Sequence, residues 1–328
     1  IDPSENEADI EWLKTNTALP AWLELELFVT EQARYDPDWK RYEYNLDLTE
    51  DEIKVYLGTY FPRSYAEAFC ITDHLFDMPT YSDAWAKKQE AHILDIGCGC
   101  GGNLMGLLCV LEKRCPSLER INITAMDGNL LAVNALQRIL EALKKRSEKE
   151  ITLDIVHEKI AGIADMRTFP SDHFDFICSF KMACELISKG GHYMAEAYYE
   201  LLAKYAHSLS PSGVLLLLDV TTKSPTDYYY PQLMNSQVST FIRDTPKYAT
   251  LVPVPCHRHE SSCNEQCFTQ KEFSITHDKC ERDKSRVAYR IIGHRAFVDS
   301  FALPSNGEFV ICKREAGDAF QVCVHSAE

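Results

Sequence analysis

Four glycines stand close together in this sequence, directly after an apolar segment. The stretch HILDIGCGCGGN contains Gly97, Gly99, Gly101 and Gly102. Glycine lets a backbone turn tightly and approach a ligand without a Cβ in the way, and a helix that begins there points its N–H groups at the ligand. The stretch therefore predicts a nucleotide-binding loop. The G-x-G-x-x-G spacing of its glycines fits both a nicotinamide cofactor and an adenosyl cofactor.

Two acids near the loop favour the adenosyl cofactor. Asp95 stands two residues before the first glycine, where a carboxylate can reach an ammonium group or the loop amides but would repel a pyrophosphate. Asp127, in the sequence MDGN, ends the next expected strand and is positioned for the hydroxyls of a ribose. It lies further from the loop than the roughly 20 residues usual for NAD. We expect Gly128 and Asn129 to belong to the same binding site.

A second group of chemically active side chains follows in CHRHESSCNEQC. Thiolates and imidazoles gathered in one short loop suit tetrahedral zinc or an iron–sulfur cluster. The spacing lacks paired Cys-x-x-Cys motifs, so unmodified thiols and a disulfide remain open beside metal binding. The candidate metal ligands are Cys256, Cys263, Cys267 and Cys280.

Alternating strands and helices must position these side chains. Apolar segments and amphipathic segments follow one another through the middle of the chain and predict strands at 92–96, 121–126, 151–157, 174–179 and 213–219. A helix is expected at 65–76, before the first of these strands, and further helices between the strands at 103–114, 129–147 and 192–208. Strands that are apolar throughout are typical of a parallel sheet covered on both faces. The expected fold class is α/β, a Rossmann-like, doubly wound and mostly parallel sheet.

We expect four regions along the chain. They are a helical N-terminal extension at 1–88, a binding core at 89–223, an insertion with the Cys/His cluster at 224–285, and C-terminal strands at 286–328 that complete the sheet. In the last region, two strands near 307–313 and 319–325 should form a hairpin at the sheet edge. The N-terminal helices and the insertion are expected to form a lid over the binding site.

The composition restricts the partners. Asp and Glu outnumber Lys and Arg by 49 to 34, a net charge of −15, and such a surface repels phosphate backbones. Nucleic acid is therefore not expected as a partner, and a small-molecule substrate is. No apolar run approaches the roughly 20 residues of a membrane span, and no secretory signal opens the chain. We expect a soluble, cytoplasmic protein of undetermined oligomeric state.

Taken in order, five motifs of this sequence resemble the class I S-adenosylmethionine (SAM) dependent methyltransferase superfamily. They are LDIGCGCGG, MDGN, ADM, FDFICSF and SLSPSGVLLLLD. The resemblance implies that Gly97 and Gly99 line the methionine part of SAM and that Asp127 binds its ribose. It also implies that Asp165 and Met166 contact the adenine. The fourth motif lacks the Asn/Asp-Pro-Pro-aromatic signature of amino-directed nucleobase methyltransferases, which makes nucleobase modification less expected.

Methyl transfer from a sulfonium needs little acid–base machinery, because the methyl group is already activated. Aromatic rings can stabilise the sulfonium by cation–π attraction, and Tyr60 and Tyr229 are the candidate catalytic residues from the aromatic clusters on either side of the core. Arg63 is a candidate partner for the carboxylate of SAM, as in the pre-core segments of this superfamily. Glu185 and His192 are candidate bases near the acceptor.

The leading hypothesis is a SAM-dependent transferase that methylates a small molecule. One alternative enzyme would use the aminocarboxypropyl arm of SAM instead, by transfer or by cyclisation with release of methylthioadenosine. A non-catalytic alternative follows from YLGTYFPRSYAEAF, PCHRH and DKSRVAYRII, which are similar to the methyltransferase-like proteins that assist assembly of the mitochondrial small ribosomal subunit. In that family the cysteines hold a metal cluster. A dehydrogenase is the remaining alternative.

Overall fold

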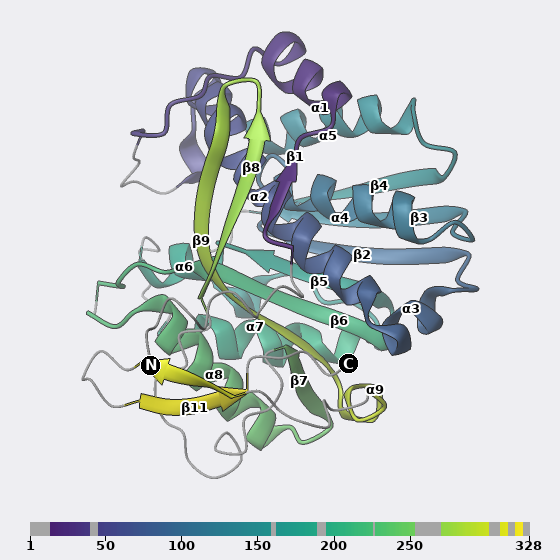
Figure 1. The fold of residues 1–328 in the computed structure, drawn as a ribbon, viewed down its shortest axis with the longest axis vertical. Helices are drawn as coiled ribbons and strands as arrows, with labels where there is room; N and C mark the ends of the chain where they lie inside the picture. Colours follow the sequence, from purple (N-terminus) through teal and green to yellow (C-terminus); the bar gives the residue numbers. More distant parts are fainter. Residues whose placement is uncertain are drawn as a thin grey trace.

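A computed structural model describes residues 14–39, 45–158, 162–188, 195–225, 227–252, 270–301, 309–313 and 319–323. Its centre is a twisted sheet, with nine strands among the described residues and with helices on both faces (Figure 1). Among the described helices, none combines the length and the apolar composition that crossing a bilayer requires.

Five parallel strands form the part of the sheet that the sequence predicted. They are β2 (Glu90–Ile96), β3 (Arg120–Asp127), β4 (Glu150–His157), β5 (Phe174–Phe180) and β6 (Leu209–Val220). Their order across the sheet is β4-β3-β2-β5-β6, and all four pairings are parallel. Sequence order runs outward in opposite directions from β2, so the carboxyl ends of β2 and β5 flank a topological switch point. Ligands bind at such a crevice in open α/β sheets.

Two hydrophobic clusters cover the two faces of the sheet. Consecutive residues Ile93 and Leu94 of β2 belong to different clusters, because successive side chains of a strand point to opposite faces. One face is covered by α2 (Glu50–Asp77), α3 (Pro79–Trp85), α4 (Gly102–Arg114) and α5 (Leu130–Lys144). The other face is covered by α6 (Ala183–Ser188), α7 (Ala197–Tyr205) and α8 (Tyr230–Asp244). The expected α/β architecture is therefore confirmed.

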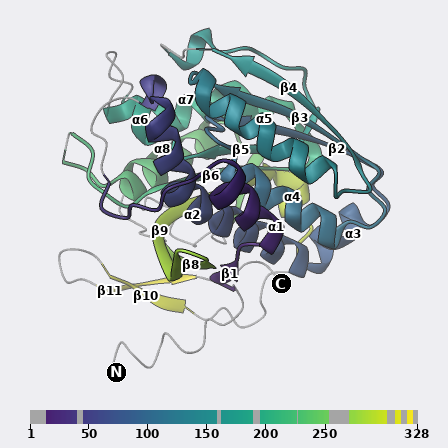
Figure 2. The ribbon, with the colours of Figure 1, turned by 90° about the horizontal axis from the view of Figure 1, so that it is seen from above.

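The long helix α2 packs along α4 (Figure 2) and continues through Pro62, whereas the sequence predicted a helix only over 65–76. It begins with a capping box in which Thr49 accepts from the Glu52 N–H and Glu52 accepts from the Thr49 N–H. Gly58 is required within it, because a Cβ there would lie 2.2 Å from the backbone oxygen of Arg34. Tertiary packing on both sides of the helix outweighs the unfavourable proline.

The N-terminal extension is not purely helical. It contains a short strand, β1 (Asn16–Ala18), which pairs parallel with β8 (Gln270–His277) at the sheet edge. A short helix, α1 (Ala21–Leu25), and a π-helical turn at Glu26–Thr30 follow. The extension therefore adds to the main sheet as well as covering it.

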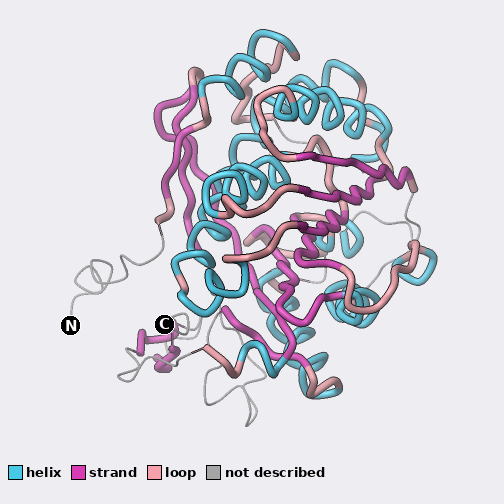
Figure 3. Tube along the Cα trace, turned by 90° about the vertical axis from the view of Figure 1, so that its right-hand side faces the viewer, coloured by secondary structure: helices cyan, strands magenta, loops and turns pink. Residues whose placement is uncertain are grey.

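The strand that completes the main sheet is β9 (Cys280–His294), which runs antiparallel to β6. It also pairs with β8 and with β7 (Tyr248–Val252), so the expected boundary at 285/286 lies inside one strand. The C-terminal hairpin was expected to complete this sheet, and that prediction is wrong. Its strands β10 (Phe309–Lys313) and β11 (Ala319–Cys323) pair with each other in a separate sheet, apart from the main one (Figure 3). The 15-residue β9 already occupies the edge of β6.

Candidate functional site

The glycine loop between β2 and α4 makes a turn that residues with a Cβ would strain. Gly97, Gly99 and Gly101 have φ angles of +72°, +52° and +83°, in the left-handed region that favours glycine. A Cβ on Gly97 would lie 2.7 Å from the Cβ of Met182, and one on Gly101 would lie 2.3 Å from Cδ1 of Leu136. The loop is thus held closely between the end of β5 and helix α5.

Asp127, at the end of β3, holds this loop from the other side. Its Oδ2 accepts from the backbone N–H of Gly99 at 2.8 Å, and its Oδ1 accepts from the backbone N–H of Asn129 at 2.8 Å. Burial raises the pKa of Asp127, and the hydrogen bonds from the Asn129, Gly99 and Gly128 N–H groups oppose that rise. Each carboxylate oxygen has a second lone pair, so the same group can accept from a ligand hydroxyl.

Asp95 lies behind the loop, buried and partly unsatisfied. Its Oδ1 accepts from Nδ2 of Asn103 at 2.8 Å, while its Oδ2 is buried without a hydrogen-bond partner. Burial raises the pKa of Asp95 to about 7, against the hydrogen bond from Asn103, and the charge of Asp127 adds to the rise. An unsatisfied buried carboxylate oxygen is costly, and a cationic ligand group would remove that cost.

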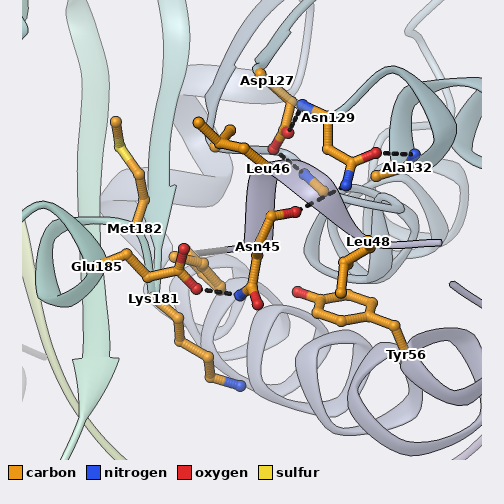
Figure 4. Close-up of a pocket in the computed structure, with 14 residues that line it drawn as sticks. Asn45, Leu46, Leu48, Tyr56, Asp127, Asn129, Ala132, Lys181, Met182 and Glu185 are labelled. Carbon is orange, nitrogen blue, oxygen red and sulfur yellow. Dashed lines mark hydrogen bonds between the residues drawn. The ribbon is translucent and has the colours of Figure 1, made fainter. Parts of the chain in front are cut away.

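An open pocket of about 660 Å³, its mouth included, lies at the carboxyl ends of β2, β3 and β5 (Figure 4). Its walls are the glycine loop, the residues after β3, the residues after β5, the N-terminal segment 45–48, and Tyr56 of α2. Gly97, Gly99, Asp127, Gly128 and Asn129, all predicted from the sequence, line it together.

The N-terminal segment crosses this pocket from one wall to the other. Nδ2 of Asn129 donates to the backbone oxygen of Asn45 at 2.7 Å, and Nδ2 of Asn45 donates to the carboxylate of Glu185 (Figure 4). Asn129 also caps α5, because its Oδ1 accepts from the Ala132 N–H at 3.0 Å. Asn45 therefore links the end of β3 to the start of α6.

The pocket wall at the end of β5 includes a strained lysine. Lys181 has a φ of +58°, and its Nζ lies 2.8 Å from Oε1 of Glu67, whose side chain is fully buried. The Lys181 ammonium also donates to Ser64 at 3.3 Å, and Ser285 of β9 donates to the same Glu67 carboxylate. The ion pair fixes Lys181 in a backbone conformation that costs of order 1–3 kcal/mol.

Six described residues predicted for the site do not line the pocket; they are Asp95, Gly101, Met166, Tyr60, Arg63 and Tyr229. The hydroxyl of Tyr60 donates to the backbone oxygen of Trp39 at 3.1 Å. Arg63 pairs with Asp283 of β9, at 2.9 Å from Nε and 2.8 Å from Nη2. Tyr229 is the N-cap residue of α8. On α2, the residue whose ring does line the pocket is Tyr56, one turn before Tyr60.

The remaining predicted residues are only partly described. Met166 is buried, with 3% of its surface exposed, and the side chain of Asp165 lies outside the described part. The proposed ligands Cys256, Cys263 and Cys267 also lie outside the described residues. Cys280 is a partly exposed free thiol on β9, and among the described residues no three potential ligands gather as a metal site.

Sequence reasoning missed Asn45, Tyr56 and Lys181. The helical spacing of Tyr56 and Tyr60 could have indicated Tyr56, and the position of Lys181 directly after a parallel strand could have indicated that residue. Nothing in the sequence around Asn45 distinguishes it from a surface asparagine.

Solved structures similar to this chain are SAM-dependent methyltransferases. The plantazolicin methyltransferase BpumL, in complex with a monoazolic desmethylPZN analog and SAH, is 12% identical with a TM-score of 0.43, over 83% of this chain and 96% of that one. A putative class I methyltransferase from Listeria monocytogenes is 14% identical with a TM-score of 0.42, over 80% of this chain and 73% of that one. A SAM-dependent methyltransferase from Methanosarcina mazei is 11% identical with a TM-score of 0.35, over 64% of this chain and 95% of that one. No protein-family model and no curated protein sequence matches the chain.

Proposed function

We propose that this protein is a SAM-dependent methyltransferase that acts on a small molecule. The observation that carries the proposal is the hydrogen bond between Asp127 and the Gly99 N–H, at the carboxyl ends of β3 and β2 and beside the switch point of a doubly wound sheet. It places a carboxylate and a backbone without Cβ atoms side by side in one pocket wall. A ribose diol beside a compact sulfonium tail needs that combination.

The residues present fit this cofactor. Gly97 and Gly99 would face the methionine part, where a Cβ on Gly97 would meet Met182. Asp127 would accept from the ribose hydroxyls, with Gly128 and Asn129 beside it. Asp95 lies behind the loop rather than in the pocket lining, and its buried, unsatisfied Oδ2 is the proposed partner of the ammonium group.

The adenine would lie toward Asp165 and Met166, as the family resemblance implies. Tyr56 and Phe180 are both aromatic residues of the pocket lining, and the Tyr56 hydroxyl lies 3.4 Å from the position of a Cβ on Gly99. We therefore assign to Tyr56 the cation–π contact that the sequence suggested for Tyr60 or Tyr229. When bound, SAM supplies an activated methyl group, and the protein has to orient a nucleophile in line with it and exclude water.

Two measurements test the proposal. Calorimetric titration of the full chain should show binding of SAM and of S-adenosylhomocysteine (SAH) but not of NADH; binding of NADH alone would replace the proposal with a dehydrogenase. Mass spectrometry after incubation with SAM then identifies the chemistry. Methylthioadenosine formed without an added acceptor would mean that the aminocarboxypropyl arm reacts instead of the methyl group.

Metal binding by Cys256, Cys263, Cys267 and Cys280 stays a prediction, as does the cytoplasmic location. Elemental analysis of the full chain checks the first. If the full chain holds a stoichiometric metal, and Cys263→Ser lowers both the metal content and the thermal stability, the result would support zinc or an iron–sulfur cluster. A metal content that this substitution leaves unchanged would exclude Cys263 as an essential ligand.

A further inference from the structure

Inside the pocket, a side-chain amide of the chain itself donates a hydrogen bond to a carboxylate. Nδ2 of Asn45 donates to the carboxylate of Glu185, while the backbone oxygen of Asn45 is held by Asn129 on the opposite wall (Figure 4). The side-chain amide of Asn45 therefore occupies the position of a small ligand that offers an N–H group to Glu185.

Glu185 lies close to the place where the methyl group would be presented. Its backbone N–H donates to the backbone oxygen of Met182 at 3.0 Å, and the side chain of Met182 packs against Gly97. Across the pocket, the hydroxyl of Tyr56 lies 3.4 Å from the position of a Cβ on Gly99. A nitrogen held by Glu185 is thus in the same pocket as Gly97 and Gly99 of the loop that would carry the methionine part of SAM.

We propose that Glu185 is the acceptor-binding residue and general base of this site and that the acceptor is a small amine. The inference rests on the proposed function. The Glu185 carboxylate takes one proton from the bound ammonium form of the acceptor and frees the nitrogen lone pair. This pair forms the new bond to the methyl carbon as the C–S bond breaks and its electrons remain on sulfur. The product leaves as a methylated ammonium with SAH, and the proton held by Glu185 passes to solvent, which restores the carboxylate.

The carboxylate discriminates between acceptor classes. It attracts an ammonium group and repels a carboxylate or a thiolate. A neutral alcohol can donate to it but needs a base stronger than a carboxylate to become a nucleophile, whereas an amine needs only to lose one proton. An amine is therefore the acceptor that this wall of the pocket fits.

Asn45 competes with the acceptor for the same carboxylate. The Asn45 amide donates to Oε1 of Glu185, so an acceptor nitrogen that takes the same position at that oxygen has to displace it. Asn45→Ala should therefore lower the KM for the acceptor, and Glu185→Gln should lower kcat. The value of kcat/KM for the acceptor should therefore rise in Asn45→Ala and fall in Glu185→Gln. Loss of folding would lower it in both variants.

The test uses four probes on one scaffold: benzylamine, benzyl alcohol, benzyl mercaptan and benzoate, each incubated with SAM and the full chain. We expect N-methylbenzylamine and SAH from the first probe and no methylated product from the others. Glu185→Gln should lower kcat/KM for benzylamine by about 100-fold while SAM affinity changes less than about two-fold. Glu141→Gln, an exposed glutamate on α5 that pairs with Lys144, is the matched control.

Three results would overturn the inference in a protein that binds SAM. They are methylation of another probe in preference to the amine, no methylation of benzylamine, and full activity of Glu185→Gln. A wild-type chain that fails to bind SAM would instead refute the proposed function, so the two failures are distinguishable.

Discussion

Asp127 accepts a hydrogen bond from the Gly99 N–H at 2.8 Å, so the end of β3 fixes the conformation of the loop that follows β2. The second oxygen of the same carboxylate accepts from Asn129 at 2.8 Å, at the start of α5. One side chain thereby connects the loop, a strand end and a helix N-terminus. A ligand that bound to Asp127 would meet a carboxylate already held in place.

Replacement of Asp127 should therefore weaken SAM binding strongly. Asp127→Ala removes the ribose partner and also releases the Gly99 N–H, and we expect affinity to fall about ten- to hundred-fold in calorimetric titration. Asp154→Ala removes an exposed acid of β4 that pairs with Arg167, and should leave affinity unchanged. Equal affinities of the two variants would exclude Asp127 from the site.

Two glycines of the loop should respond differently to alanine. Both have a left-handed φ, but a Cβ on Gly101 would lie 2.3 Å from Leu136, whereas one on Gly99 would lie 3.4 Å from the Tyr56 hydroxyl in the pocket. Gly101→Ala should lower the free energy of unfolding by about 1–3 kcal/mol more than Gly99→Ala, measured by urea denaturation. Gly99→Ala should mainly weaken SAM binding. The reverse pattern would contradict this geometry.

The buried Asp95 should make stability depend on pH. Its pKa is about 7 in the folded chain against an ordinary value of 3.8, so between these values the folded state binds more protons than the unfolded state. The free energy of unfolding should therefore fall as pH rises from about 4 to 7 and level off above that. In Asp95→Asn this part of the dependence should be absent. A pH profile identical to that of the wild type would show that Asp95 does not titrate in this range.

The same ionisation should strengthen binding of the cofactor. Ionised Asp95 attracts the ammonium of SAM, so we expect the dissociation constant to fall as pH rises from about 6 to 7.5. Methylthioadenosine lacks that ammonium and is the control ligand. If both ligands showed the same pH dependence, Asp95 would not contact the methionine tail.

Loss of Lys181 should destabilise the fold, because the Glu67 carboxylate would remain buried without the ammonium group that neutralises its charge. Lys181→Met should cost about 3–5 kcal/mol in urea denaturation, and Glu67→Gln in the same chain should restore part of it. Lys284→Met removes an exposed pair with Glu272 and should cost less than about 1 kcal/mol. Similar losses for the two single variants would show that burial of Glu67 has no energetic consequence.

Much of the core could be predicted from the sequence alone. The central strands β5 and β6 are apolar over consecutive residues, and β3 and β4 alternate apolar with polar residues. The glycines of the loop satisfy a local conformational requirement, as the positive φ of Gly97 and Gly101 demonstrates. Asp127 was predictable for the same reason, because its place depends on where one strand ends. These features depend on neighbours in the sequence, which periodicity and residue type reveal.

Contacts between distant segments were decided only by tertiary structure. Arg63 is directed to Asp283, 220 residues away, because α2 packs beside β9, and so it is not in the pocket. Asn45 reaches Glu185 from 140 residues away; Glu185 was a candidate base from the sequence, but no local pattern marks Asn45 as its partner. Strand β6 pairs with β9 rather than with the C-terminal hairpin, since a strand pairs with the partner that packing of the chain brings alongside it. The sequence alone thus predicted the glycine loop and Asp127, while the contacts of Asn45, Arg63 and the strand at the edge of β6 depend on how the folded chain brings its segments together.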